Sequence, residues 1–379
     1  MSVIVAGVGV TRFGKLPERS VESLAVEAVR TALRDAGIGS NEVDLAYSSS
    51  LFQPPGHGQR YLKHVGLAGV PIVNVENACA SSSTGILQAA SMIEVGAAEV
   101  VLCVGAESHT SPGVLPKPDQ SVFGRMGMSW PAKYALEARA EIENGHVSAD
   151  QLARIAVKNR LNASLNPNAQ FQQRITVEEV LASRMVSDPL TLLQCCPQSD
   201  GAAAVVLTSS THRAAHASGR RPVTLAGSAI RSGALIDRGK PQPQHNVTRR
   251  ASHAAYEIAS VAPEDLDVCE VHDAFTIGEY EHYESLGLCA PGQAGMLIET
   301  GATELSTPGV VVSPGGGLLS RGHPIGATGA AQMAEIVTQL RGEAGDRQVD
   351  HARVGLTHTM GGTDYQLESN VCVVHILTT

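Results

Sequence analysis

Apolar and polar residues follow two different periods along the chain, and the period predicts whether a segment is a helix or a strand. Residues 21–36 carry Ala, Val and Leu at helical spacing, and this run stops at Gly37, a residue type that commonly ends helices. The apolar runs at 71–75, 99–107 and 201–209 are typical of buried strands. Because such strands alternate with helices across short glycine turns, we expect an α/β protein with a parallel or mixed sheet.

The pattern changes between about residues 112 and 184. Charged and amide side chains become more frequent there, and an amphipathic helix is predicted at 149–164. We expect this segment to be an excursion from the core. The polar, proline-rich stretch at 239–246 is the expected internal boundary, which divides the chain into halves 1–245 and 246–379.

The second half repeats the pattern of the first. Residues 32–45 align without gaps on 255–268, with helix, turn and strand in the same order, and a later segment that starts at Cys79 aligns on one that starts at His323. Two matches in the same order favour a duplication. If the two units pack about a pseudo-twofold axis with the following helices at the centre, the thiol and the imidazole face each other.

Composition narrows the class of protein. The chain has a net charge of −9 and no basic cluster, which argues against nucleic acid as the main partner. No apolar run approaches the roughly 20 residues that a membrane-spanning helix needs. The seven cysteines show no CxxC pairing, and the N-terminus lacks a basic leader. We therefore expect reduced thiols and a cytoplasmic protein.

Cys79 lies where a predicted strand passes into a predicted helix, in the sequence NACASSSTG. The positive end of the helix dipole favours a thiolate there, and free backbone N–H groups can stabilise an oxyanion. His323 is the expected base, and the small residues after Cys79 leave room for a substrate. A single cysteine is more often a small buried hydrophobic residue, but its position and the histidine at the equivalent place favour a nucleophile.

His323 itself lies in a glycine-rich segment, SPGGGLLSRGHPIGATG. Such a loop lets the backbone approach a ligand closely. It could instead hold phosphate, but the chain has neither a Walker lysine nor a GxGxxG after a strand.

Two further histidines follow or end predicted strands. His272 precedes Asp273 in VCEVHDAF, and His358 lies in VGLTHTMGG. Because ligands bind at strand ends on one side of an α/β sheet, we expect these histidines at the same edge as Cys79 and His323. Three histidines could suggest zinc, but their spacing resembles no metal motif, so we predict no metal.

Together these motifs resemble those of the thiolase superfamily, and specifically the sterol-carrier-protein-2-like thiolases of bacteria and archaea. The similarity extends from VGVTRFG near the start to VVHIL near the end. The motifs that carry it are NACASSSTG, EVHDAFTIGEYEHYESLGLC, GGGLLSRGHPIGATGAAQ and THTMGG.

The resemblance implies a five-layered αβαβα fold of two similar halves, a dimer formed through the N-terminal half, and a loop domain at about 112–184 that covers the bound thioester. It implies that the substrate acylates Cys79, that His323 activates this thiol and helps to hold a thioester oxygen, and that His272 contributes to a first oxyanion site through water. The N–H groups of Cys79 and of the Gly361 region would form the second oxyanion site.

The chain departs from the family in one respect that affects the mechanism. Thiolases use a second cysteine as acid and base, but the two places where it occurs hold Ala274 and Thr359. His358 is the nearest replacement by motif, whereas Cys289 is too far along the chain to assign. Relatives with such motifs often work with a small zinc-ribbon/OB-fold companion that helps to bind the acyl-CoA, so the resemblance implies a homodimer to which such a companion subunit can be added.

The leading function is that of an acyl-CoA C-acyltransferase that cleaves or forms a 3-oxoacyl-CoA, with a CoA thioester as substrate and no cofactor. One alternative is a retro-aldol lyase acting on a β-hydroxyacyl-CoA, against which the intact Cys79 argues. Another is a non-catalytic subunit that binds CoA esters, against which the two intact catalytic motifs argue.

Overall fold

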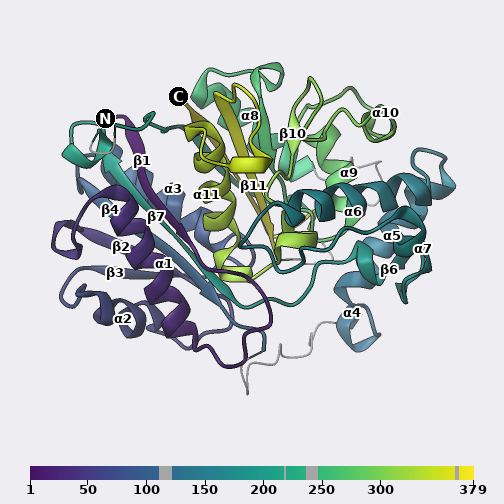
Figure 1. Cartoon of the computed structure of the whole chain (residues 1–379). Coiled ribbons are helices and arrows are strands. Elements are labelled where there is room, and N and C mark those ends of the chain that lie inside the picture. Colours follow the sequence, from purple (N-terminus) through teal and green to yellow (C-terminus); the bar gives the residue numbers. More distant parts are fainter. Residues whose placement is uncertain (111–121, 217–218, 236–245, 363–366) are drawn as a thin grey trace.

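The main sheet of the molecule is mixed, and the order of its strands is symmetrical. The computed structural model describes residues 1–110, 122–216, 219–235, 246–362 and 367–379. Within these residues a ten-stranded sheet has the order β10-β9-β11-β12-β8-β1-β7-β4-β2-β3 (Figure 1). Its strands are β1 (Val3–Val10), β2 (Leu45–Ser49), β3 (Ile72–Val75), β4 (Val100–Glu107), β7 (Gly201–Ser209), β8 (Thr224–Ser232), β9 (Val268–Glu270), β10 (Val311–Val312), β11 (Val354–Gly361) and β12 (Val371–Thr378).

The sheet consists of two half-sheets with the same topology. Counted outward from the centre, β1-β7-β4-β2-β3 and β8-β12-β11-β9-β10 each have two antiparallel pairings followed by two parallel ones. The half-sheets meet where Ile4 pairs with Thr224 and the Val5 N–H donates to the Val223 carbonyl (2.9 Å). This mirrored order agrees with the duplication that the sequence predicts.

The position of β8 bears on the expected division of the chain. β8 precedes the boundary expected at residues 245 and 246, yet it pairs with β12 along its length and touches β1 at one point. In the sheet, the two half-sheets therefore meet between β1 and β8. Along the chain, the change from one half-sheet to the other comes between β7 and β8. The segment 236–245, which holds the expected boundary, lies outside the described residues.

Helices cover both faces of each half-sheet. α1 (Val21–Ala36) packs on β1, β7 and β4, and α8 (Asn246–Ala259) packs on β8 and β12. α3 (Ser81–Glu94) and α11 (Thr328–Arg341) contact each other and strands of both halves, and α11 lies near the centre of the molecule (Figure 1). Their buried side chains join one apolar core with strands of both halves, which places the starts of these two helices side by side.

The remaining helices connect and cover this core. They are α2 (His57–Leu62), α4 (Val122–Arg125), α5 (Trp130–Glu143), α6 (Ala149–Ser164), α7 (Val177–Ala182), α9 (Thr276–Ser285) and α10 (Ala294–Thr300), and a separate hairpin consists of β5 (Met185–Ser187) and β6 (Leu190–Thr191). No helix of the described residues is long and apolar enough to cross a membrane.

Local sequence explains where the predicted helices begin and end. α1 starts after Ser20, whose hydroxyl accepts the N–H of Ser23, and it ends at Gly37 in the left-handed conformation. α6 has the bounds predicted from its amphipathic pattern, because the Ser148 side chain and Gln151 cap each other's backbone N–H groups.

The segment expected to be an excursion from the core, 112–184, contains α4 to α7. α5 and α6 both pack on α9, and Tyr134 of α5 stacks on Phe275 with ring centroids 4.4 Å apart. Residues 111–121 of this segment lie outside the described residues.

Candidate active site

Cys79 lies in a tight turn between β3 and α3. The preceding Ala78 has φ of 49°, a left-handed conformation that is uncommon for a residue with a side chain. Ser81 holds this turn from both sides, because its Oγ accepts the N–H of Asn77 (2.8 Å) and donates to the carbonyl of Ala78 (2.6 Å). Backbone strain of this kind is common at functional sites, and here it aims the thiol away from the helix.

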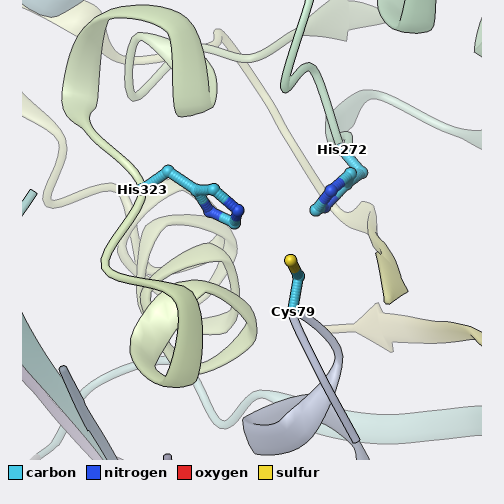
Figure 2. Close-up of side chains that lie close together, drawn as sticks. All are labelled: Cys79, His272 and His323. Carbon is cyan, nitrogen blue, oxygen red and sulfur yellow. The ribbon is translucent and has the colours of Figure 1, made fainter. Parts of the chain in front are cut away.

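Three of the predicted site residues meet. The Cys79 sulfur and one ring nitrogen each of His272 and His323 lie within 4.8 Å of one another. The two imidazoles lie edge to face, with centroids 5.3 Å apart, and Figure 2 shows all three side chains pointing toward a common point. The duplicated pattern of the sequence therefore predicts correctly that this thiol and this imidazole come together.

The surroundings of His323 set its tautomer. Its Nδ1 lies 2.7 Å from Oγ1 of Thr328, and that hydroxyl donates its proton to the carbonyl of Pro324 (3.1 Å). We assign the single proton of the hydroxyl to the Pro324 carbonyl, so that Nδ1 carries the hydrogen of the contact with Thr328 and Nε2 keeps a lone pair. Burial, followed by the nearby His272, His109 and Arg321, holds the pKa of His323 well below its usual value. The ring is therefore neutral and can accept a proton.

Burial also sets the protonation state of the nucleophile, Cys79. It raises the pKa of the partly buried Cys79 thiol to about 12, although N–H groups of Gly362 and of Cys79 itself oppose this shift. The helix-dipole argument predicts a thiolate, but burial outweighs the dipole. The resting group is a thiol that needs a base, and the His323 ring is beside it.

The end of β11 approaches the nucleophile turn closely. A side chain on Gly361 would place its Cβ 2.5 Å from the Asn77 carbonyl oxygen and 3.0 Å from the Ala80 nitrogen. The absence of that side chain lets the N–H of the next residue, Gly362, point at the Cys79 sulfur. Backbone N–H groups of Gly362 and of Cys79 itself thus lie beside the sulfur, next to the place where the carbonyl of an attacked thioester would come.

His358 does not lie where the sequence analysis expects it. It sits within β11 opposite Val374, not at a strand end, and it is fully buried. Its Nδ1 accepts the backbone N–H of His272 (3.3 Å), and its Nε2 lies 3.1 Å from Oγ1 of Thr248. The apolar alternation of a strand does not say which face a residue takes, and here the ring lies behind His272, outside the cluster.

The two positions that replace the second cysteine supply no proton carrier. Thr359 is buried and donates its hydroxyl to Oγ of Ser83 (2.7 Å), and Ala274 has no titratable group.

A buried frame that the sequence analysis did not identify joins the segments of His272 and His323. Glu270 and Arg321 form an ion pair (2.9 Å) in the interior, and Glu270 also accepts the N–H of Gly315 (2.9 Å). The carboxylate of Asp273 accepts the N–H groups of Leu318 (2.6 Å) and Leu319 (3.3 Å) in the same glycine-rich loop. Charged residues inside otherwise apolar or glycine-rich motifs were the available signal for this frame.

Cys79 and His272 line a small pocket with a cavity volume of about 20 Å³. One wall comes from α5, which lies in the segment expected to cover the thioester, although the sequence analysis named no residue of this helix as a site residue. The lining residues are Cys79, Trp130, Lys133, Tyr134, Glu137, His272, Met360, Gly361, Gly362 and Ser369.

A thiol and two imidazoles are also a set of side chains that binds zinc, and the three ligand atoms are close enough to do so. A metal ion would occupy the sulfur that acyl transfer uses. The absence of a metal from the working site stays a prediction.

Two family descriptions match consecutive parts of this chain. "Thiolase, N-terminal domain" matches residues 2–211, and "Thiolase C-terminal domain-like" matches residues 227–375.

Curated relatives match over nearly the whole chain. An acetyl-CoA acetyltransferase of Methanothermobacter thermautotrophicus is 38% identical over 388 aligned residues, which cover 99% of both chains. Benzoylsuccinyl-CoA thiolase subunit BbsB of Thauera aromatica is 39% identical over 369 residues, 95% of this chain and 94% of the relative. Sterol carrier protein 2 of Gallus gallus is 37% identical over 382 residues, 95% of this chain and 69% of the relative.

Solved structures show the same fold. An Ltp2-ChsH2(DUF35) aldolase has a TM-score of 0.86 at 27% identity and covers 100% of this chain and 98% of its own. Human mitochondrial 3-ketoacyl-CoA thiolase has a TM-score of 0.74 at 18% identity with the same coverage, a likeness of fold alone.

Proposed function

The chain belongs to the thiolase superfamily and is a thiolase-type acyltransferase, and on that premise we propose that it cleaves or forms a 3-oxoacyl-CoA through an acyl-enzyme on Cys79. The observation that carries this proposal is the meeting of the Cys79 sulfur with ring nitrogens of His272 and His323. The tautomer that Thr328 imposes on His323 adds a base beside a protonated thiol.

The first half of the reaction follows from these positions. Nε2 of His323 takes the thiol proton as the Cys79 sulfur attacks the carbonyl carbon of the substrate, and the N–H groups of Cys79 and Gly362 stabilise the oxyanion. In the synthetic direction the departing CoA thiolate receives the proton from His323, which leaves an acyl group on sulfur and CoA as a free thiol. His272 would face the thioester oxygen of the second substrate, directly or through water.

The larger framework is part of the proposal. We propose that the two half-sheets and their helices correspond to the five layers of the thiolase fold, with the halves divided between β7 and β8 rather than at residues 245 and 246, and with 112–184 as the loop domain that covers the thioester. β3 is an edge strand with Val73 exposed at 41%, which supports a homodimer formed through the N-terminal half. One solved relative is titled as a complex with a DUF35 partner, and this supports a companion subunit as an alternative or an addition.

A second candidate function is retro-aldol cleavage of a β-hydroxyacyl-CoA. It is favoured by the TM-score of 0.86 to an aldolase and by the absence of the second cysteine at positions 274 and 359. A lyase needs a base for the hydroxyl group but no acyl-enzyme, so it gives no reason for the strained turn and the paired imidazoles at Cys79. A non-catalytic CoA-ester-binding subunit gives no reason for them either.

Intact-mass spectrometry after incubation with acetyl-CoA or acetoacetyl-CoA tests the proposal. We expect an acyl adduct on the wild-type chain and on Cys289→Ala, which removes another partly buried thiol, and none on Cys79→Ala. An adduct that survives in Cys79→Ala contradicts the acyl-enzyme. Cleavage of a β-hydroxyacyl-CoA at an undiminished rate in Cys79→Ala favours the lyase.

A further inference from the structure

Carbon–carbon bond formation needs a group that takes a proton from the α-carbon of the second thioester. The family motif offers positions 358 and 359 for this proton-accepting group, but the contacts of both side chains exclude them. Thr359 donates its hydroxyl to Ser83, and His358 engages the His272 N–H and the Thr248 hydroxyl with its two ring nitrogens. Among the residues that the structure describes, this leaves another wall of the pocket as the source of the proton carrier.

Helix α5 supplies that wall. Lys133, Tyr134 and Glu137 are spaced so that they share one face of the helix, and all three line the pocket that contains Cys79 and His272. The stacking of Tyr134 on Phe275 fixes the rotation of α5, and Phe275 belongs to the same motif as His272. Glu137 lies one turn beyond Tyr134, and its Oε2 is shielded from solvent. The helix thus places a carboxyl group in the wall of the pocket that Cys79 and His272 also line.

The other groups of this wall are donors. A lysine ammonium has three N–H donors and no acceptor. Burial, followed by the charge of Glu137, raises the pKa of Tyr134 well above its usual value, so its hydroxyl keeps its proton. A glutamate carboxylate is an acceptor, and among the described lining residues of α5 it is the group that can accept a proton.

We propose that Glu137 of α5 is the catalytic acid/base that exchanges a proton with the α-carbon of the thioester, in place of the second cysteine of thiolases. This inference rests on the proposed function, because it presupposes a Cys79 acyl-enzyme.

The proposed step balances as follows. In the synthetic direction the Glu137 carboxylate takes one α-proton of the second acyl-CoA, and the resulting enolate attacks the acyl carbon on Cys79. The carbon–carbon bond forms as the carbon–sulfur bond to Cys79 breaks, and the sulfur leaves as a thiolate. The proton then passes from Glu137 to this thiolate, through His323 or directly, and both residues return to their starting forms. In the reverse direction protonated Glu137 delivers the proton to the enolate.

Exchange of α-protons with D₂O isolates this step. The full chain, together with any subunit that co-purifies with it, is incubated with acetyl-CoA, propionyl-CoA or succinyl-CoA, and deuterium in the recovered thioester is measured by mass spectrometry. We expect Glu137→Gln to lose about 100-fold or more of the exchange rate and to keep the acyl adduct on Cys79. Glu137→Asp should recover part of the loss. Glu143→Gln, on the exposed side of the same helix, should exchange within twofold of wild type.

Each other outcome decides against the inference. Wild-type exchange in Glu137→Gln contradicts it, and so does a wild-type chain that forms the adduct but exchanges with none of the three thioesters. Cys196, whose N–H donates to the carbonyl of Ala274 (2.8 Å), is the rival thiol near the motif that lacks the cysteine. Loss of exchange in Cys196→Ser with normal exchange in Glu137→Gln would assign the proton to that thiol. Failure of the proposed function is distinct, because then no Cys79 adduct forms.

Discussion

Nδ1 of His323 lies 2.7 Å from the hydroxyl oxygen of Thr328, and this contact decides which ring nitrogen is available to Cys79. Thr328 is the first residue of α11, five residues after the histidine, so the start of the helix holds the ring that lies in front of it. The hydroxyl can accept from Nδ1 because its own proton goes to the Pro324 carbonyl. Thr328 is therefore a positioning residue that holds the ring of the base, His323.

Replacement of Thr328 by valine should lower activity and leave folding almost intact. Valine keeps the shape but removes the acceptor, so His323 loses its fixed tautomer at a cost of about 1 kcal/mol, which corresponds to a fall of about five- to tenfold in the rate of Cys79 acylation. Stopped-flow acylation and urea unfolding measure the two effects. Thr338→Val is the matched control, because that hydroxyl on the same helix donates to the Ala334 carbonyl, away from the site. Equal acylation rates in both variants would contradict the role of Thr328.

The sequence could predict the meeting of Cys79 with His323, because a duplicated unit places equivalent residues symmetrically about the centre. It also predicted α1 and α6, whose caps lie next to their apolar patterns. It could not orient His358, since the side of a strand that a ring takes depends on the strand's neighbours. Nor could it assign Glu137 to the site, because the contact of α5 with the pocket exists only after the inserted segment packs on α9.

Alkylation of Cys79 should rise steadily with pH. Its pKa is raised to about 12, whereas a free cysteine titrates near 8.5, so the thiolate fraction should grow about tenfold per pH unit between pH 7 and 10 without a plateau. Iodoacetamide labelling, with Cys79→Ala to identify the site, measures this. A plateau near pH 8 would mean that a thiolate–imidazolium pair already exists in the resting enzyme.

The same raised pKa has a consequence for stability. Because the folded protein holds the Cys79 proton more tightly than the unfolded chain, this group's contribution is complete below about pH 8.5 and is lost as the pH rises toward about 12. The lowered pKa of His323 has its effect at low pH. Because the unfolded chain binds that proton more readily, the contribution of His323 to stability is lost as the pH falls below about 6.5. In a urea series the wild-type chain should therefore lose more stability than Cys79→Ala between pH 9 and 11. Parallel losses in the two chains would show that the Cys79 proton is not involved.

Removal of one partner of the Glu270–Arg321 pair should destabilise the protein strongly. Both side chains are at most 3% exposed, so Glu270→Gln leaves an unpaired buried guanidinium, and we expect a loss of about 3 kcal/mol or more in the free energy of unfolding. The acylation rate should fall as well, because this pair holds the segments of His272 and His323 together. Asp150→Asn, which breaks an exposed pair with Arg154, is the control and should leave the urea midpoint unchanged. A urea midpoint that stays unchanged in Glu270→Gln would show that the ion pair makes no net contribution to the free energy of unfolding.

Gly361→Ala should impair the oxyanion site while leaving the fold intact. The added methyl group would approach the Asn77 carbonyl oxygen to 2.5 Å, so the end of β11 must withdraw from the turn that carries Cys79. The N–H of Gly362 then no longer points at the sulfur, and loss of one oxyanion donor costs about 100-fold or more in rate.

Gly14→Ala is the matched control, since a Cβ there would meet its nearest neighbour at 3.9 Å. We expect Gly361→Ala to retain its circular dichroism spectrum and to acylate Cys79 slowly, with a larger fall in kcat than in substrate affinity. If acylation in Gly361→Ala matches that of Gly14→Ala, the N–H groups at the end of β11 do not stabilise the developing charge, and that charge must be held from the side of α3 alone.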